Sequence, residues 1–207
     1  KNLNNYEHSK ALEVIENYFW QFCDDYIELV KNRAYGTADS TGHVPSEKAV
    51  KSARTALGLG LDAFTRLLAP YLPYATEEVW SWMHGGEGSV HRAAWPKAET
   101  YAAAAFKASP ELLTHAGEAL AALRGIKSKA KVSMKTPILS VKLGVSDEVR
   151  GSIESALTDI AEAGRVVGRI SFVGAAAEAK AEAEAAIDVI VADSELGEPP
   201  AKKPKNQ

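Results

Sequence analysis

Two clusters of basic side chains are the residues whose types and spacing best suit binding to an anionic ligand. The first cluster comprises Lys31, Arg33, Lys48, Lys51 and Arg54. The second comprises Arg124, Lys127, Lys129, Lys131 and Lys135. Lysine and arginine bind nucleic-acid phosphates, so both clusters are candidate RNA-binding sites. Solvated helix faces carry the same residue types, so composition alone leaves a purely structural role open.

Side chains that perform catalysis form no recognisable site in this sequence. It contains no glycine-rich phosphate loop, no paired Cys/His zinc spacing and no serine nucleophile elbow. The histidines lack the i, i+4 spacing that places two metal ligands on one helix face; they are His8, His43, His84, His91 and His115. We therefore predict no catalytic residue, no metal site and no cofactor in this chain.

Composition restricts the class of protein. The 207 residues carry a net charge of −3 and a pI near 6.0, so any positive field must be local. Cys23 is the single cysteine, which excludes an internal disulfide and favours a reducing, cytoplasmic setting; its helical pattern favours a core position over a nucleophile. No apolar run is long enough to cross a bilayer, so we expect no membrane partner. We also expect a monomer.

Three helices are predicted in the first half of the chain. Apolar residues recur every three or four positions from Leu12 to Leu29 and from Val50 to Leu68. Gly36 is expected to end the first helix, and Ser46 to cap the second. A shorter helix follows Pro73, with Thr76 as its expected cap and the pair Gly85–Gly86 as its end. Residues 89–91 are expected to be extended.

Helices and strands alternate in the second half. A helix is predicted from Pro110 into the lysine-rich segment, and a strand at Leu139–Leu143. Another helix spans Val149–Ile160 and is closed by Gly164. Two β-branched strands follow, at residues 170–173 and 187–191. Residues 175–186 fit a helix or a solvated link, and we favour the link.

These elements predict an α+β fold. An antiparallel helical bundle occupies residues 1–100, and a small helix-strand-helix-strand-strand module occupies residues 101–196. The boundary is expected within the alanine-rich connector at residues 97–109. Residues 197–207 are rich in proline and lysine and predict a disordered basic tail.

Two sequence stretches carry a family resemblance. Residues 6–12 (YEHSKAL) and 19–31 (FWQFCDDYIELVK) closely resemble the anticodon-binding domain of valyl-tRNA synthetases. Residues 67–80 (LLAPYLPYATEEVW) resemble a segment shared by the valyl, isoleucyl and leucyl enzymes, and residues 88–91 and 95–96 continue it. The resemblance is strong over the first hundred residues, weaker over residues 126–137, and less diagnostic from Ile138 onward.

The resemblance implies a tRNA-binding portion of an enzyme that joins valine to tRNA(Val) with ATP. ATP would be used by a catalytic domain elsewhere in that enzyme, which would also be a partner of this chain. Both basic clusters would contact tRNA phosphates. The equivalent region of an isoleucyl or leucyl enzyme, or a helical scaffold without an RNA role, stays open as an alternative.

Two features differ from the family pattern. The chain starts at Lys1 inside a helical pattern, without an initiator methionine, so we expect it to be a piece from the C-terminal part of a longer protein whose upstream helices help to read the anticodon. Many bacterial valyl enzymes end in a long coiled-coil arm, whereas this chain ends in a short α+β module and a Pro-Lys tail, so we expect the armless variant. Residues 131–135 (KVSMK) resemble the KMSKS signature only superficially, because the order differs and no HIGH-like motif precedes them.

Aromatic residues are candidates for stacking on RNA bases. Phe19, Phe22 and Tyr26 fall on the apolar face of the first helix and are expected in the core. Most of the four tryptophans are also expected in the core. The four are Trp20, Trp80, Trp82 and Trp95. Trp20 lies off the apolar face and is the best candidate for an exposed platform, although packing against an upstream helix explains it better.

Overall fold

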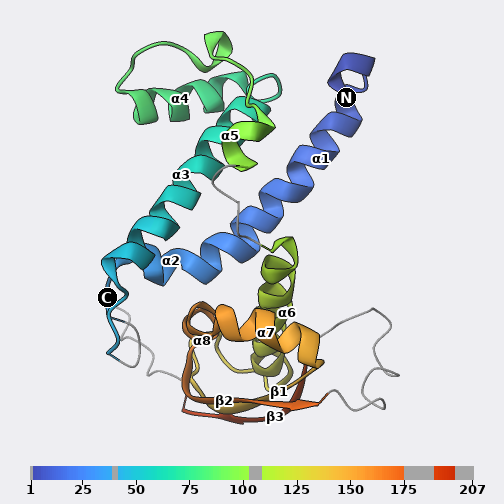
Figure 1. Ribbon diagram of the computed structural model, residues 1–207. Helices are drawn as coiled ribbons and strands as arrows, with labels where there is room; N and C mark the ends of the chain where they lie inside the picture. Colours follow the sequence, from blue (N-terminus) through green and yellow to red (C-terminus); the bar gives the residue numbers. More distant parts are fainter. Residues whose placement is uncertain (1, 39–41, 103–108, 175–188, 199–207) are drawn as a thin grey trace, which may run out of the picture. The chain divides into compact units, whose positions relative to one another are not determined.

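The computed structural model describes residues 2–38, 42–102, 109–174 and 189–198. The chain forms two compact units (Figure 1). Residues 1–27 and 48–108 make unit 1, and residues 28–47 and 109–207 make unit 2. The segment 28–47, which the sequence analysis grouped with the first hundred residues, thus belongs with the α+β module.

Unit 1 is helical. Its longer helices are α1 (His8–Gln21), α3 (Glu47–Leu68) and α4 (Pro73–His84). Shorter elements are the 3₁₀ turns η1 (Leu3–Asn5) and η3 (Val90–Arg92) and the helix α5 (Ala98–Ala102). The predicted apolar spacing fits this arrangement, since Phe19 of α1 lies edge-on to Phe64 of α3, with ring centroids 5.4 Å apart.

A π-helical segment, η2 (Phe22–Ile27), follows α1, where the sequence predicted a regular α-helix. The Phe22 ring stacks on Tyr26 and contacts Phe64 of α3, with both pairs of ring centroids 5.4 Å apart. A Cβ atom at Gly60 would lie 2.4 Å from Phe22 Cζ. The absent side chain at Gly60 is what lets the aromatic ring reach the backbone of α3.

The start of α4 corrects the expected cap. Pro73 occupies the first turn, where its missing N–H costs nothing, and Leu72 stands at the N-cap position. Thr76 is buried one turn inside the helix, and its hydroxyl donates to the Leu72 and Pro73 carbonyls. The predicted end is confirmed, because Gly85 adopts the left-handed conformation at φ 62°.

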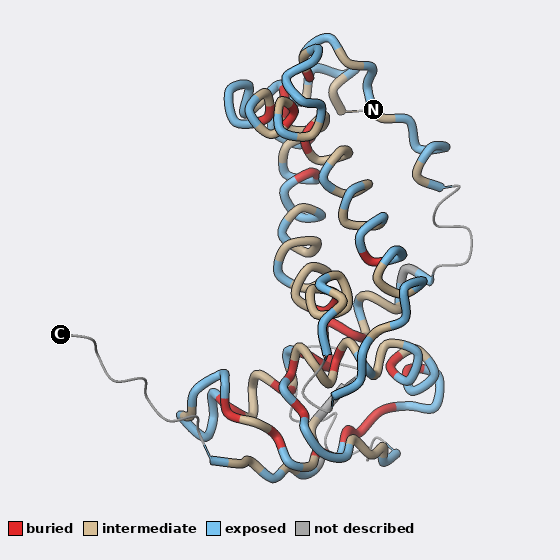
Figure 2. The backbone as a smooth tube through the Cα atoms, turned by 90° about the vertical axis from the view of Figure 1, so that its left-hand side faces the viewer, coloured by how far each residue is buried: buried red, intermediate tan, exposed pale blue. Residues whose placement is uncertain are grey.

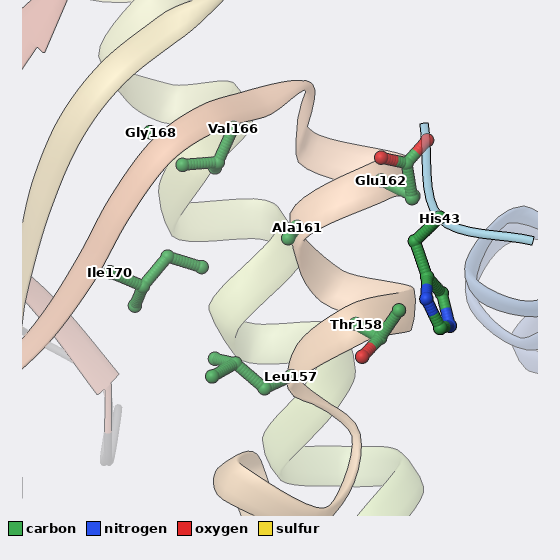
Figure 3. A pocket seen from close by; sticks show the side chains of 8 residues that line it. All are labelled: His43, Leu157, Thr158, Ala161, Glu162, Val166, Gly168 and Ile170. Atoms are coloured by element: carbon green, nitrogen blue, oxygen red, sulfur yellow. The ribbon is translucent and has the colours of Figure 1, made fainter. Parts of the chain in front are cut away.

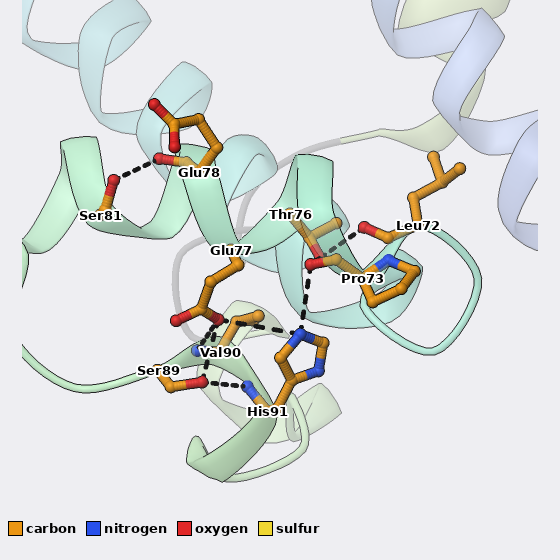
Figure 4. A network of polar contacts seen from close by, with 9 residues as sticks. All are labelled: Leu72, Pro73, Thr76, Glu77, Glu78, Ser81, Ser89, Val90 and His91. Carbon is orange, nitrogen blue, oxygen red and sulfur yellow. Dashed lines mark hydrogen bonds and ion pairs between the residues drawn. The ribbon is translucent and has the colours of Figure 1, made fainter.

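A polar network ties the loop after α4 back to that helix (Figure 4). The Glu77 carboxylate accepts hydrogen bonds from the Ser89 hydroxyl at 2.9 Å and the Val90 N–H at 3.1 Å. His91 Nε2 lies 3.2 Å from the Pro73 carbonyl. Only Ser89 is extended; residues 90–92 form η3, because the Ser89 hydroxyl accepts the His91 N–H and starts a turn.

Unit 2 is an α+β module with a three-stranded sheet. Its helices are α2 (Glu28–Tyr35), α6 (Pro110–Lys129), α7 (Asp147–Ser155) and α8 (Leu157–Gly164). Its strands are β1 (Ile138–Val145), β2 (Val166–Gly174) and β3 (Val189–Leu196), in the order β2-β1-β3. Strand β1 pairs parallel with β2 and antiparallel with β3. The predicted succession of elements is confirmed.

The core of unit 2 lies between the sheet and helices α6, α7 and α8, which cover one sheet face (Figure 1). Leu120 and Leu123 of α6, Leu143 of β1, and Ile153 and Ile160 of the following helices are fully buried. Figure 2 shows buried residues in red on both the strands and the helices of this module. Burial of these side chains fixes where α6 and α8 end, and thereby positions the basic residues at those ends.

Two details of the module differ from the sequence prediction. The helix expected across residues 149–160 is broken at Ala156 into α7 and α8. The left-handed residue after α8 is Arg165, at φ 55°, and not Gly164. Gly164 is buried instead, with Leu123 Cδ1 only 2.4 Å from where its Cβ would be. Residues 175–186 and most of the predicted basic tail lie outside the described residues.

Candidate nucleic-acid interface

The end of α6 presents three exposed lysines, Lys129, Lys131 and Lys135. Lys131 adopts a left-handed conformation, φ 52°, one position beyond the C-cap. Its N–H donates to the Ser128 carbonyl, and the Val132 N–H donates to the Lys127 carbonyl, both at 3.0 Å. This is the Schellman pattern, in which the left-handed position is usually glycine. The motif turns the chain away from the helix and leaves the Lys131 side chain in solvent.

Lys127, predicted as a phosphate ligand, is buried, with 2% of its surface exposed. Its ammonium donates to the Gly164 carbonyl at 2.8 Å and to the Met134 carbonyl at 3.1 Å. Burial lowers the pKa of Lys127, and the nearby positive charges of Arg165 and Arg124 lower it further. Lys127 therefore joins the loop after α6 to the end of α8, and its ammonium is not available to solvent.

Arg165, which was not among the predicted binding residues, is an exposed cation at the same place. It follows Gly164, whose carbonyl is one of the two that accept a hydrogen bond from the Lys127 ammonium, and its own carbonyl accepts the Ile138 N–H at 2.8 Å. Lys135 stands next to Met134, the other partner of Lys127. Within the described residues, no ion pair involves Lys129, Lys131, Lys135 or Arg165. We call these four residues the basic surface.

Lys31 and Arg124 share one carboxylate. Glu28 Oε2 lies 2.7 Å from Lys31 Nζ and 3.3 Å from an Arg124 guanidinium nitrogen. All three side chains are about one-third or more exposed, so this arrangement contributes little to folding. The shared carboxylate offsets part of the positive charge that Lys31 and Arg124 would offer to a phosphate.

Arg33 pairs with Asp159 at 2.9 Å, and both side chains are mostly buried. Burial raises the pKa of Asp159, while the charge and hydrogen bond of Arg33 oppose that rise. A second polar pair accompanies it, in which Asn32 donates to Glu162 at 3.0 Å. These contacts attach α2 to α8, so the guanidinium of Arg33 holds the module together.

Replacing Arg33 with methionine is expected to destabilise unit 2 by about 2 kcal/mol at neutral pH, because it leaves the Asp159 carboxylate buried without a partner. The pKa of Asp159 in the folded protein then rises further. Between the ordinary pKa and this raised pKa, Asp159 is protonated in the folded variant but ionised in the unfolded chain. The loss of stability caused by the substitution therefore disappears as the pH falls through the raised pKa. Urea unfolding across a pH series measures this. A deficit that grows with acidity would contradict it, and Arg150→Gln, at an exposed pair, is the control.

Lys48, Lys51 and Arg54 are exposed on α3 and belong to unit 1. Lys31 and Arg33 of the same predicted cluster belong to unit 2. The first cluster is thus divided between the two units, whereas Lys127 directly links the segments that carry the second. The second cluster is the better defined surface.

A pocket of about 320 Å³ lies between α8 and β2 (Figure 3). Leu157 and Ala161 of α8 and Val166 and Ile170 of β2 give it an apolar lining. His43, Thr158, Glu162 and Gly168 complete it, and Glu162 already accepts a hydrogen bond from Asn32. The pocket contains no residue of the basic surface, so it is a separate feature.

The tryptophan prediction is corrected by the structure. Only Trp80 is buried, with Arg66 lying over its ring and the His84 ring tilted by 32° against it at a centroid distance of 3.9 Å. Trp82, Trp20 and Trp95 are 72%, 56% and 48% exposed. Trp82 escapes burial because α4 turns only the face that carries Trp80 toward the core. Trp20 is exposed in this chain, and its packing against an upstream helix stays a prediction.

Other predicted features are also located by the structure. Cys23 is partly buried in η2, and burial together with the Asp24 charge raises the pKa of its thiol. No group of His, Cys, Asp and Glu residues in the described part of the chain is arranged to hold a metal ion. Over the same residues, no helix is long and apolar enough to span a membrane.

Comparison with known proteins identifies relatives. A family profile described as the anticodon-binding domain of tRNA ligase matches residues 1–143. Over 205 residues, 99% of the chain, the sequence is 72% identical to a valine–tRNA ligase of Bifidobacterium longum. It is 40% identical to the valine–tRNA ligase of Cutibacterium acnes over 97% of the chain, and 47% identical to that of Leifsonia xyli over 80%. The chain spans 22%, 20% and 18% of the lengths of these three relatives.

Proposed function

The chain belongs to the anticodon-binding domain family of tRNA ligases, and from this membership we propose that it binds tRNA(Val) as part of a valine–tRNA ligase. The complete enzyme would use ATP to join valine to that tRNA in the cytoplasm, as a monomer. In this proposal ATP binding and bond formation belong to the enzyme's catalytic domain. The chain described here holds the tRNA so that its acceptor end reaches that domain.

The observation that carries the proposal is the basic surface at the end of α6 and the loop after it. Lys129, Lys131 and Lys135 are exposed, and none of them forms an ion pair with a carboxylate among the residues that the structure describes. An uncompensated lysine releases a counterion from the RNA when it binds a phosphate, and this release favours association. Because the net charge of the chain is −3, attraction to RNA has to come from a local surface of this kind.

Single substitutions test the surface. Lys131→Gln and Lys135→Gln in the full-length ligase are each expected to weaken tRNA(Val) binding severalfold and to reduce the slope of log K against log salt by at most about one unit. The measurement is fluorescence anisotropy of labelled tRNA over a salt series. Arg150→Gln is the matched control, because Arg150 is an exposed cation of the same unit that pairs with Glu154.

The second proposed contact is the α3 group, Lys48, Lys51 and Arg54, on unit 1. Lys31 and Arg33 of the first cluster are held in ion pairs within unit 2, so we assign them a smaller contribution to binding. If the lysine variants of the basic surface leave the salt slope unchanged while Lys48→Gln and Lys51→Gln reduce it, the tRNA lies on α3 instead. That result would remove the basic surface from the proposal.

A further inference from the structure

Two helices of unit 2 end in the same unusual way. Lys131 follows α6 at φ 52°, and Arg165 follows α8 at φ 55°. A residue with a Cβ atom is sterically disfavoured in this region, which is why glycine is the usual residue at such helix ends. Both positions carry an exposed long cation instead of glycine.

The buried Lys127 side chain connects these two helix ends. A single ammonium contacts the Gly164 carbonyl, next to Arg165, and the Met134 carbonyl in the loop that starts at Lys131. The sheet continues the link, because Ile138 pairs with Val166 at the start of β1 and β2. The ends of α6 and α8 are therefore neighbours although they are distant in the sequence.

The electrostatics of this place are unfavourable for folding. A buried ammonium and the nearby arginines Arg124 and Arg165 repel one another, and this repulsion contributes to the lowered pKa of Lys127. Helix carbonyl ends offset some of the positive charge, but a glycine at either end would satisfy the backbone without adding charge. Both cations occupy strained backbone positions where glycine would favour folding. This points to a role for them outside folding.

We propose that the ends of α6 and α8 form one phosphate-binding site for the tRNA backbone, with Lys131 and Arg165 as the contacting residues and Lys127 as the positioning residue beneath them. This inference rests on the proposed function and goes beyond it by placing Lys131 and Arg165 of the basic surface on one phosphate. Arginine supplies a planar set of donors that suits a phosphate, and lysine supplies a second, flexible charge.

The site predicts that stability and binding change in opposite directions. Lys131→Gly and Arg165→Gly each remove a cation and the steric strain of a Cβ atom at a left-handed position, so neither should lower the melting temperature. Each should weaken tRNA binding severalfold in the full-length ligase and reduce the salt slope by at most about one unit. Tyr6→Gly is the matched control, because Tyr6 is the remaining non-glycine residue with positive φ in the described chain and carries no charge. It should leave the salt slope unchanged.

A double-mutant cycle tests whether the two cations share one site. When both bind the same phosphate, the double variant Lys131→Gly/Arg165→Gly should lose at least threefold less affinity than the product of the two single losses. Independent effects that multiply would overturn the shared site. Lys127→Met should also weaken tRNA binding although its side chain is buried; if that variant does not fold, the glycine variants decide.

The outcomes separate this inference from the proposed function. If Lys135→Gln reduces the salt slope while Lys131→Gly and Arg165→Gly leave it unchanged, the paired site is wrong and the lysine surface stands. If none of the three changes tRNA binding, the basic surface and the paired site are both wrong. A fall in melting temperature in both glycine variants would overturn the argument that the cations are kept at a cost to folding.

Discussion

Replacing Gly168 with alanine is expected to destabilise the α+β module by roughly 3 kcal/mol or more, because the added methyl group has no space. A Cβ atom at position 168 would lie 1.7 Å from the Leu139 carbonyl oxygen. Both atoms belong to or attach directly to the backbone, so no side-chain rotation relieves the overlap. The strands would have to separate at this point.

The reason lies in the register of β1 and β2. Ile138 pairs with Val166 and Ser140 with Arg169, so two residues of β2 stand opposite Leu139 of β1. This bulge presses Gly168 against the neighbouring strand. Urea unfolding followed by circular dichroism measures the loss. Gly174→Ala in the same strand is the control, because nothing lies within 4 Å of its Cβ position. Equal stability of the two variants would contradict the bulge.

Neutralising the whole basic surface is expected to have the largest effect on binding. Each phosphate contact contributes up to about tenfold to affinity near 0.1 M salt, since the salt slope is roughly −0.9 for each contact. The variant Lys129→Gln/Lys131→Gln/Lys135→Gln/Arg165→Gln should therefore bind tRNA(Val) about 100-fold more weakly if at least two of the four side chains contact phosphates. The salt slope should become shallower at the same time.

A matched variant shows that position matters and not total charge. Neutralising four exposed cations elsewhere gives the same net charge; suitable positions are Lys10, Arg92, Lys97 and Arg150. This control should retain most of the affinity and the full salt slope. Similar losses in both variants would mean that tRNA binding follows net charge, and the basic surface would lose its special role.

The elements of the fold follow from sequence periodicity. Apolar spacing predicted α3, α6 and β1, because burial of one face decides each of them, and β-branched runs predicted β2 and β3. The π-helical segment η2 and the break at Ala156 were not predicted, since each depends on a packing partner: Gly60 admits the Phe22 ring, and the sheet sets the direction of α8. Thr76 has a good capping residue type, but Pro73 fixes an earlier start for α4.

The basic surface could be predicted only in part. Lys127 and Lys129 look alike in sequence, yet the first faces the end of α8 and the second faces solvent. Arg33 likewise meets Asp159, a residue that no local pattern connects to it. Arg165 was missed because the pairing of β1 with β2 brings it to the loop after α6. The signal available in the sequence was a basic residue at a helix end, where glycine is usual.

Site-specific crosslinking tests most directly whether tRNA lies on the basic surface. A photoreactive amino acid is placed at position 135 of the full-length ligase and, in a separate protein, at position 150, which lies on α7. The proposal predicts that irradiation links tRNA(Val) to position 135 and not to position 150, and that excess unlabelled tRNA(Val) competes for the link. Crosslinking at position 150 with none at position 135 would contradict it.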